Sequence, residues 1–390
     1  MSHVALIIPG LDRIGGAERQ VILLAKGLRR RGWRVSVVAL TGSGGSAAAE
    51  LVATGAAFLS LEMRKGLADP RGWIRFNRWL KRENPDVVHA HLPHAAWLAR
   101  WSRLAAPVRA VVDTLHSSST GSLGRQWGYR LSNWLPDQIT AVSHAVAEAH
   151  ISARMASAAK LAVLPNGVDV EAWRPDAEIR TYLRRELGLE SEFLWFAAGR
   201  LEPVKDYPAL LSAMAGLPQP SRLMIAGSGP LQNELLRLSK RHGLANRVRF
   251  LGFEPDVRRW MQAADGFVLT SRWEGLPMGL LEAAACALPA VATNVPGTRE
   301  AIIDGQTGWL TPPGSVTALR DAMTGLMRTT PEERQAMGAR ARQRVIEQFS
   351  LESVLNRWEA LYENLLQRNP KPLRWGRELI PSAKRPGKTG

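Results

Sequence analysis

The sequence predicts an α/β protein with two domains, each built on an open parallel sheet. The chain has 390 residues, 45% of them hydrophobic, and a single hydrophobic core rarely grows beyond about 250 to 300 residues. In both halves, short apolar runs enter glycine-containing turns that lead into segments with helical spacing. In open sheets of this kind, ligands bind at the carboxyl ends of the strands. We therefore expect two cores, with functional side chains at the strand ends.

The first half begins with an apolar run, HVALIIPG at residues 3–10, which predicts a buried strand. A glycine turn at Gly15 and Gly16 opens an amphipathic helix, which ends in the basic run 29–31 as suits the negative end of a helix dipole. The two glycines remove side chains where the backbone must approach another group closely. The other interpretation is a tight turn chosen only for its backbone angles. The turn lacks the full GxGxxG fingerprint, which argues against a nicotinamide site.

Histidines end two later strands of the first half. The run PDVVHAH predicts a strand with His89 and His91 on one face, because strand side chains alternate. His94 lies just beyond them, but no nearby carboxylate or thiol completes a ligand set, so we predict no metal site. The run VRAVVDTLHS predicts another strand with His116 at its exit. After the first half, residues 173–191 are charged and weakly periodic, and they are the best candidate for a linker.

The strand ends of the second half carry cations and glycines. The run FLWFAAG leads into a turn that holds Arg200 and Lys205. The segment LMIAGSGP repeats the order of strand, glycine turn and helix, with Gly229 in the turn. Because such turns all fall on the carboxyl edge of a parallel sheet, we expect these groups to converge.

The stretch RWEGLPMGLLEAAACALP, residues 272–289, predicts a turn that runs directly into a buried helix. Its apolar residues recur at helical spacing, and Pro277 suits the first turn. The free amides at the helix start form an anion site flanked by Glu274 and Gly275. Glu282 would lie about 12 Å further along the helix, where it suits neutral hydroxyls such as those of a ribose. The alternative is a capped core helix whose two glutamates merely face solvent.

Composition restricts the partners and the compartment. The formal net charge of +16 indicates an anionic partner, which can be nucleic acid, a membrane surface or a phosphorylated substrate. No recognition helix or RNA-binding motif stands out, so we expect no nucleic acid. The single cysteine, Cys286, allows no intramolecular disulfide, in keeping with a reducing compartment. Because no apolar run suits a signal peptide or a membrane span, we expect a soluble cytoplasmic protein.

Three segments of the first half interleave tryptophan with basic residues: WIRFNRWLKR, WLARWSRL and RQWGYRLSNWL. Such segments can lie in a membrane interface, with Trp at the headgroups and Arg toward anionic lipid. The alternative is a core stripe of Trp73, Phe76 and Leu80 with solvated cations on the other face. The basic tail 368–390, which we predict to be disordered, would add a weak anchor. We expect peripheral contact with an anionic membrane, on the inner face of the cytoplasmic membrane.

Six motifs occur in order along the chain: IGGAER at residues 14–19, VVDTLHS, LPNGVD at residues 164–169, GRL with Lys205, AGSGP, and the pair Glu274 and Glu282. This ordered set resembles glycosyltransferase family 4, the retaining group 1 enzymes of the architecture called GT-B. The resemblance covers residues 3–365 and implies two Rossmann-like domains that face each other across a cleft, with the C-terminal helix crossing back to the first domain. The implied parts are an acceptor-binding domain (1–172), a nucleotide-sugar-binding domain (173–350), the crossing helix (351–367) and the tail (368–390).

The resemblance also implies a function. The expected activity is that of a hexosyltransferase, which moves a hexose or N-acetylhexosamine from a nucleotide-diphosphate sugar to an acceptor with retention of configuration. The expected acceptor is a saccharide, in particular a lipid-linked saccharide of envelope polysaccharide, lipopolysaccharide or exopolysaccharide assembly. No cofactor and no metal are expected. The triplet 169–171 looks like the acidic metal motif of single-domain glycosyltransferases, but it lies in an interdomain passage where the family uses no metal.

Charge development and the resemblance together suggest residue roles. Negative charge builds on the departing phosphate in the transition state, so cations and backbone amides must stabilise it. The predicted catalytic residues are His116, Arg200, Lys205 and Glu274. The predicted donor-binding residues are Gly15, Gly16, Arg200, Lys205, Gly229, Gly275, Leu276 and Glu282. The predicted acceptor-side residues are His89 and His91.

Two other classes of protein stay open. A sugar-nucleotide epimerase of the same architecture would use related nucleotide and phosphate sites, and would need acid and base carboxylates near the sugar. A non-catalytic membrane-surface scaffold would need neither the two glutamates nor the cations and glycine turns.

Overall fold

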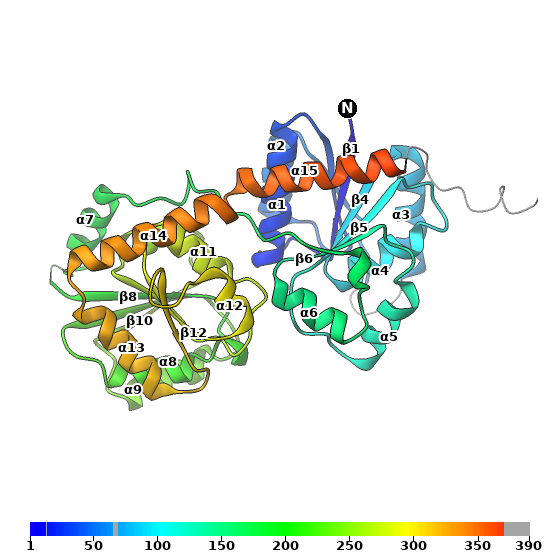
Figure 1. Ribbon diagram of the computed structural model, residues 1–390. Helices are drawn as coiled ribbons and strands as arrows, with labels where there is room; N and C mark the ends of the chain where they lie inside the picture. Colours follow the sequence, from blue (N-terminus) through cyan, green and yellow to red (C-terminus); the bar gives the residue numbers. More distant parts are fainter. Residues whose placement is uncertain (13, 65–68, 190, 370–390) are drawn as a thin grey trace, which may run out of the picture.

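Two parallel sheets organise the chain, one in each half (Figure 1). The structure is a computed structural model that describes residues 1–12, 14–64, 69–189 and 191–369. The predicted tail therefore lies almost wholly outside the described residues. Both sheets are covered by helices on both faces, as parallel sheets require. The prediction of two Rossmann-like α/β domains is confirmed.

The first sheet has seven strands in the order β3-β2-β1-β4-β5-β6-β7, and all neighbours are parallel. The strands are β1 (His3–Ile8), β2 (Arg34–Ala39), β3 (Ala57–Ser60), β4 (Val87–His91), β5 (Ala110–Leu115), β6 (Gln138–Ala141) and β7 (Leu161–Val163). The helices are α1 (Gly16–Arg30), α2 (Gly45–Ala53), α3 (Pro70–Glu83), α4 (Pro93–Ser102), α5 (Leu123–Ser132) and α6 (His144–Ser152). All six residues of β1 are buried, because the sheet is covered on both sides.

The second sheet has six parallel strands in the order β10-β9-β8-β11-β12-β13. The strands are β8 (Phe193–Ala198), β9 (Ser221–Ala226), β10 (Val248–Gly252), β11 (Gly266–Leu269), β12 (Ala290–Thr293) and β13 (Gly308–Thr311). The helices are α7 (Ala177–Glu186), α8 (Tyr207–Ala215), α9 (Gln232–Arg241), α10 (Arg258–Ala263), α11 (Met278–Ala285), α12 (Pro296–Ala301), α13 (Val316–Arg328) and α14 (Pro331–Phe349). The strand order reverses between β8 and β11, and a crevice for ligands forms at such a switch point.

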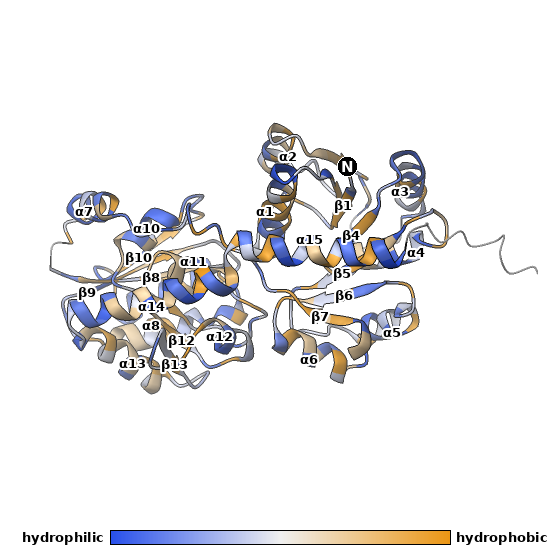
Figure 2. Ribbon diagram, turned by 45° about the horizontal axis from the view of Figure 1, so that its top comes forward, coloured by the Kyte–Doolittle hydropathy of each residue, from blue (hydrophilic) through white to orange (hydrophobic). Residues whose placement is uncertain are grey.

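The last helix, α15 (Leu351–Arg368), crosses from the second domain to the first. Figure 1 shows α14 lying along the second domain and α15 continuing across the first. Along α15, apolar and polar patches alternate (Figure 2), and the apolar side chains join the core of the first domain. At Gly27 of α1, a Cβ atom would stand 2.4 Å from the side chain of Leu355, so a larger residue would force Leu355 to move. The prediction of a helix that crosses back is confirmed.

One local prediction is wrong. The charged, weakly periodic stretch 173–191 predicts a linker, but residues 177–186 form helix α7. Arg180 and Arg184 lie one turn apart on this helix, and both form ion pairs with Asp265. The charged helix is therefore docked on the second domain by a carboxylate some 80 residues later in the chain, which local periodicity does not reveal.

Candidate active site

The two domains touch along the strand-end edges of both sheets. Gly275 lies directly against the main chain of His116, because a Cβ atom at residue 275 would stand 2.3 Å from the carbonyl oxygen of His116. A second contact joins α12 to α6, where the carboxylate of Glu300 accepts hydrogen bonds of 2.9 Å from the amides of His144 and Ala145. The start of α11 in the second domain is therefore adjacent to the end of β5 in the first.

Lys205 and Glu274 form the central polar contact on the second domain. The Nζ atom of Lys205 lies 2.5 Å from Oε1 of Glu274, and the hydroxyl of Ser271 donates to the same oxygen over 2.6 Å. Lys205 ends the short 3-10 turn after β8, and Glu274 follows β11. Because β8 and β11 are neighbours in the sheet, their carboxyl ends bring the two residues together. Both side chains are mostly buried, which orients the ammonium group at the start of α11.

Arg200 does not join this contact. Its side chain is 74% exposed and pairs with Glu202 at 2.9 Å. Ion pairs this exposed contribute little to stability. The guanidinium of Arg200 is therefore not held near Lys205, although both residues leave the same strand end.

Glu282 lies on α11, about one turn after the start of the helix. Its side chain is half-buried, and no described residue donates a hydrogen bond to it. Burial raises the pKa of Glu282 to about 7, and the positive charge of Arg19 opposes that rise in part. A partly buried carboxyl group without a protein partner is suited to accept a hydrogen bond from a ligand hydroxyl.

The three predicted histidines form a contact chain at the ends of β4 and β5. Nδ1 of His91 lies 3.0 Å from Nε2 of His116, and the rings of His89 and His91 lie 4.1 Å apart. Burial lowers the pKa of His116 to about 4, so its ring is neutral at neutral pH. Burial also lowers the pKa values of His89 and His91 well below the usual value. His89 is fully enclosed between Thr114 and Tyr362, at 2.6 and 2.7 Å.

The predicted glycines have different neighbours. The amide of Gly15 donates to the carboxylate of Glu18 over 3.0 Å, so it is already occupied. A Cβ atom at Gly16 would meet Met278 at 3.6 Å, which places this loop against the start of α11. At Gly229, a Cβ atom would stand 2.5 Å from a carbonyl oxygen of the preceding strand-end loop, so Gly229 is needed for that close approach. Leu276 is buried, and its carbonyl oxygen accepts a hydrogen bond from the side-chain amide of Asn166, in the passage between the domains.

The acidic triplet 169–171 has a structural role in the described chain. Oδ1 of Asp169 accepts from the amides of Glu171 and Ala172, at 3.2 and 3.0 Å, and so closes a turn. Among the residues that the structure describes, no group of three or more His, Cys, Asp or Glu side chains is placed to hold a metal ion. The buried thiol of Cys286 is a core group, and burial raises its pKa to about 12.

A cavity of about 260 Å³ lies beside His116, on its first-domain side. Trp273 lines it from the second domain, and Arg125 and Tyr129 line it from α5. Serines at residues 117 and 119 add polar groups. Sequence reasoning overlooked Trp273 as a site residue, although it directly precedes Glu274, and treated Arg125 only as one cation of a basic segment.

The tryptophan-rich segments divide between core and surface. On α3, Phe76 and Leu80 are buried, but Trp73 is 38% exposed, so the expected core stripe holds only in part. On α5, apolar side chains lie on the surface, with Trp127 58% and Leu131 65% exposed. In the described part of the chain, no helix is both long enough and apolar enough to cross a membrane.

Two protein families match the chain, one in each domain. Residues 14–172 match the family described as "Glycosyltransferase Family 4". Residues 180–344 match the family described as "Glycosyl transferases group 1". The two matches meet close to the passage between the sheets.

Individual relatives share about a quarter to a third of their residues with the chain. An N-acetyl-alpha-D-glucosaminyl L-malate synthase of Bacillus anthracis is 31% identical over 74% of the chain and 77% of the relative. A phosphatidyl-myo-inositol mannosyltransferase of Mycobacterium leprae is 31% identical over 84% of the chain and 87% of the relative. A UDP-Gal:alpha-D-GlcNAc-diphosphoundecaprenol alpha-1,3-galactosyltransferase of Escherichia coli is 27% identical over 77% and 81%.

Solved structures repeat the arrangement of the two domains. HepE of Anabaena, solved in complex with UDP, superposes with a TM-score of 0.82 at 24% identity, over 93% of the chain and all of HepE. A sucrose-phosphate synthase of Thermosynechococcus elongatus superposes with a TM-score of 0.81 at 21% identity, over 94% and 100%. At these identities the likeness concerns the fold.

Proposed function

This chain belongs to glycosyltransferase family 4, and from that premise we propose that it is a retaining, metal-independent hexosyltransferase acting on a lipid-linked saccharide. The donor is a nucleoside-diphosphate hexose or N-acetylhexosamine. One observation carries the proposal: the buried contact of Lys205 with Glu274 lies at the start of α11, where the second domain touches His116 of the first.

Lys205 stabilises the departing diphosphate in this proposal. Its ammonium group has three donors, of which Glu274 uses one, so the group can bind phosphate while Glu274 keeps it in place. The amides at the start of α11, which begins four residues after Glu274, share the developing negative charge. Glu274 orients hydroxyls of the transferred sugar, and Glu282 accepts from a ribose hydroxyl. The exposed Arg200 turns from Glu202 to the phosphate when the donor binds.

His116 positions the sugar and does not serve as a general base. A ring with a pKa of about 4 is neutral at neutral pH, and it donates or accepts one hydrogen bond at low cost. The proton of the acceptor hydroxyl passes to the leaving phosphate oxygen on the same face of the sugar. The new bond therefore forms on the face that the phosphate leaves, which retains the configuration.

Charge and the names of two relatives support the proposed acceptor and location. Two relatives are named for lipid-linked or lipid acceptors, a diphosphoundecaprenol-linked sugar and phosphatidyl-myo-inositol. A net charge of +16 favours anionic lipid surfaces. The enzyme acts at the inner face of the cytoplasmic membrane, as a peripheral protein.

A transfer assay tests this proposal. Radiolabelled UDP- and GDP-sugars are incubated with the protein and membrane lipid extract, in EDTA and in Mg²⁺, and the anomeric configuration of the product is read by NMR. We expect equal transfer in both buffers and a product that keeps the donor's configuration. An inverted product, or turnover that chelator abolishes and magnesium restores, contradicts the proposal.

A further inference from the structure

Arg125 lines the cavity beside His116 and has no partner among the residues that the structure describes. It is half-buried, and its guanidinium makes no hydrogen bond or ion pair with any described residue. Residues 114–136 contain no Asp or Glu, and the acidic residues on either side are already paired, Asp113 with Arg100 and Asp137 with Arg103. A partly desolvated cation without a counterion is costly, so the position is suited to an anionic ligand.

The opposite face of α5 is apolar and open to solvent. Leu123, Trp127 and Leu131 are spaced four residues apart, so they form one stripe along the helix. Their exposed fractions are 74%, 58% and 65%. The guanidinium of Arg130 lies 5.2 Å from the Trp127 ring, a pairing of aromatic and cation typical of lipid headgroup regions. We call these three side chains the α5 stripe.

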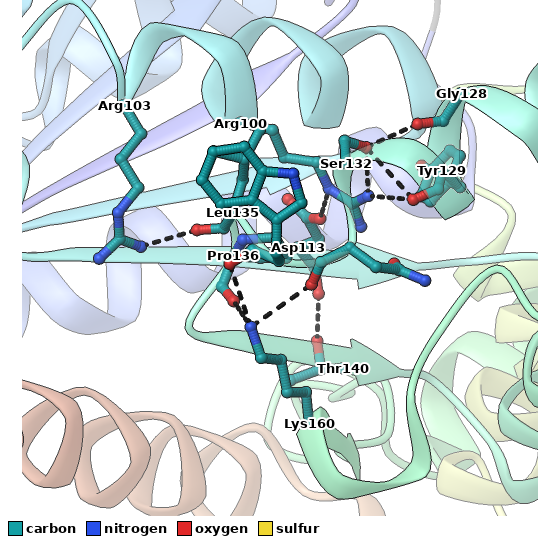
Figure 3. Close-up of polar contacts among 12 residues, drawn as sticks. Arg100, Arg103, Asp113, Gly128, Tyr129, Ser132, Leu135, Pro136, Thr140 and Lys160 are labelled. Atoms are coloured by element: carbon teal, nitrogen blue, oxygen red, sulfur yellow. Dashed lines mark hydrogen bonds and ion pairs between the residues drawn. The ribbon is translucent and has the colours of Figure 1, made fainter.

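A buried polar network fixes the orientation of α5. Figure 3 shows Arg100 of α4 between Asp113 of β5 and the inner face of α5. Arg100 donates to Asp113 over 2.5 Å and to the hydroxyl of Ser132 over 2.8 Å, and its guanidinium lies 4.4 Å from the Tyr129 ring. Trp97 also packs where a side chain at Gly128 would be. Because this inner face is tied down, α5 cannot rotate to bury its stripe.

Helix α5 thus carries an apolar stripe on its outer face and, toward the interior, Arg125, which has no partner among the described residues and lines the same cavity as His116. We propose that α5 admits the acceptor, a lipid that carries its saccharide through a phosphate or diphosphate. The lipid tail lies along the α5 stripe in the membrane, Arg125 binds the phosphate, and the saccharide occupies the cavity under Trp273. This inference rests on the proposed function and assigns its acceptor class to Arg125 and the α5 stripe.

Acceptor kinetics test the role of Arg125. The variant Arg125→Gln is compared with Arg78→Gln, which alters another arginine without a described partner, on the exposed face of α3. Each is assayed with a polyprenyl-diphosphate-linked saccharide and with the same saccharide as a phosphate-free alkyl glycoside. Arg125→Gln should raise KM for the phosphate-linked acceptor at least about tenfold, since a charge-assisted contact is lost. Its kinetics with the alkyl glycoside, and those of Arg78→Gln with both acceptors, should stay within about twofold.

Vesicle binding tests the α5 stripe and shows whether Arg125 binds the phosphate of a polyprenyl lipid or that of an ordinary anionic phospholipid. Neutral phosphatidylcholine vesicles are doped either with polyprenyl diphosphate or with phosphatidylglycerol, and bound protein is measured by cosedimentation. Replacing the three stripe residues by serine should weaken binding to both vesicles, while Val52→Ser, an exposed apolar control on α2, should not. Arg125→Gln should weaken binding only where polyprenyl diphosphate is present.

The outcomes are distinct. Equal effects of Arg125→Gln on both acceptors or on both vesicles overturn the inference, because Arg125 would then not recognise the phosphate of the acceptor. No effect on any of them overturns it also. If the parent protein transfers no sugar to any lipid-linked acceptor but binds polyprenyl diphosphate through Arg125, the proposed function fails and the binding site stands.

Discussion

Gly275 of the second domain lies against the main-chain carbonyl of His116 in the first, so closely that a Cβ atom there would stand 2.3 Å from the oxygen. Real Cβ atoms do not approach a backbone oxygen this closely, so any other residue must push the two domains apart. The contact sets the distance between the start of α11, where we propose that the phosphate binds, and the end of β5. It also explains why glycine is needed in the turn before α11.

Gly275→Ala should therefore reduce activity more than stability. We expect kcat/KM to fall by about 10²-fold, the scale of a misplacement near 1 Å, while the melting temperature changes by a few degrees at most. Gly124→Ala is the control, because nothing lies within 4 Å of its Cβ position. Full activity of Gly275→Ala would show that the domain contact is not maintained during turnover.

Lys205→Gln should abolish most turnover without unfolding the protein. Removing the ammonium group removes charge stabilisation of the leaving phosphate, and the expected loss in kcat is about 10² to 10³-fold. Arg222→Gln is a matched control, since it breaks an ion pair with Glu192 of comparable burial on the far side of the same domain. Steady-state kinetics and circular dichroism are the measurements. Activity within threefold of the parent would remove Lys205 from the mechanism.

Glu282 should make stability depend on pH. Its pKa is about 7 in the folded protein and near 4.5 when unfolded, so the folded state binds the extra proton in between. Stability from this group is therefore highest below about pH 4.5 and falls as the pH rises to about 7. Glu282→Gln removes the titrating group. The free energy of unfolding of the variant, relative to that of the parent, should therefore be higher at pH 8 than at pH 5 by on the order of 2 kcal/mol. Urea unfolding at both pH values measures the difference, and a gain independent of pH would contradict the assignment.

Glu300 should hold the two domains in the closed arrangement. Its carboxylate accepts from the amides of His144 and Ala145 at the start of α6, a contact typically worth about 1 kcal/mol. Glu300→Gln should open the domains, raise the radius of gyration in small-angle scattering and increase KM for the acceptor about fivefold. Glu347→Gln, on the exposed face of α14, is the control. An unchanged scattering profile together with unchanged KM would count against an interdomain role.

Tyr362→Phe should show whether His89 stabilises the fold or contacts the acceptor. The phenol of Tyr362 lies 2.7 Å from Nδ1 of His89, and both side chains are fully buried. Loss of this hydrogen bond should lower the free energy of unfolding by about 1 to 2 kcal/mol, while the KM values stay within about twofold. Tyr182→Phe is the exposed control. A large rise in acceptor KM at unchanged stability would instead place His89 in the acceptor site.

Part of the site could be predicted because parallel sheets leave little choice. Apolar runs and glycine turns identify the strands, and strand ends of one sheet must share one edge. The meeting of Lys205 with Glu274 follows from that rule alone, although about 70 residues separate them. The same rule places His91 and His116 side by side at the ends of β4 and β5.

Tertiary structure decided which predicted groups are held and which are free. Arg200 and Lys205 follow the same strand, but Lys205 pairs with the mostly buried Glu274, whereas Arg200 pairs on the surface with Glu202. Helical spacing marks both Phe76 and Trp127 as members of apolar faces, yet Phe76 is buried and Trp127 is exposed. The closeness of Gly275 to His116 depends on how two separately folded sheets dock. Local sequence determines the elements and their ends, whereas burial and domain contacts depend on partners that are distant along the chain.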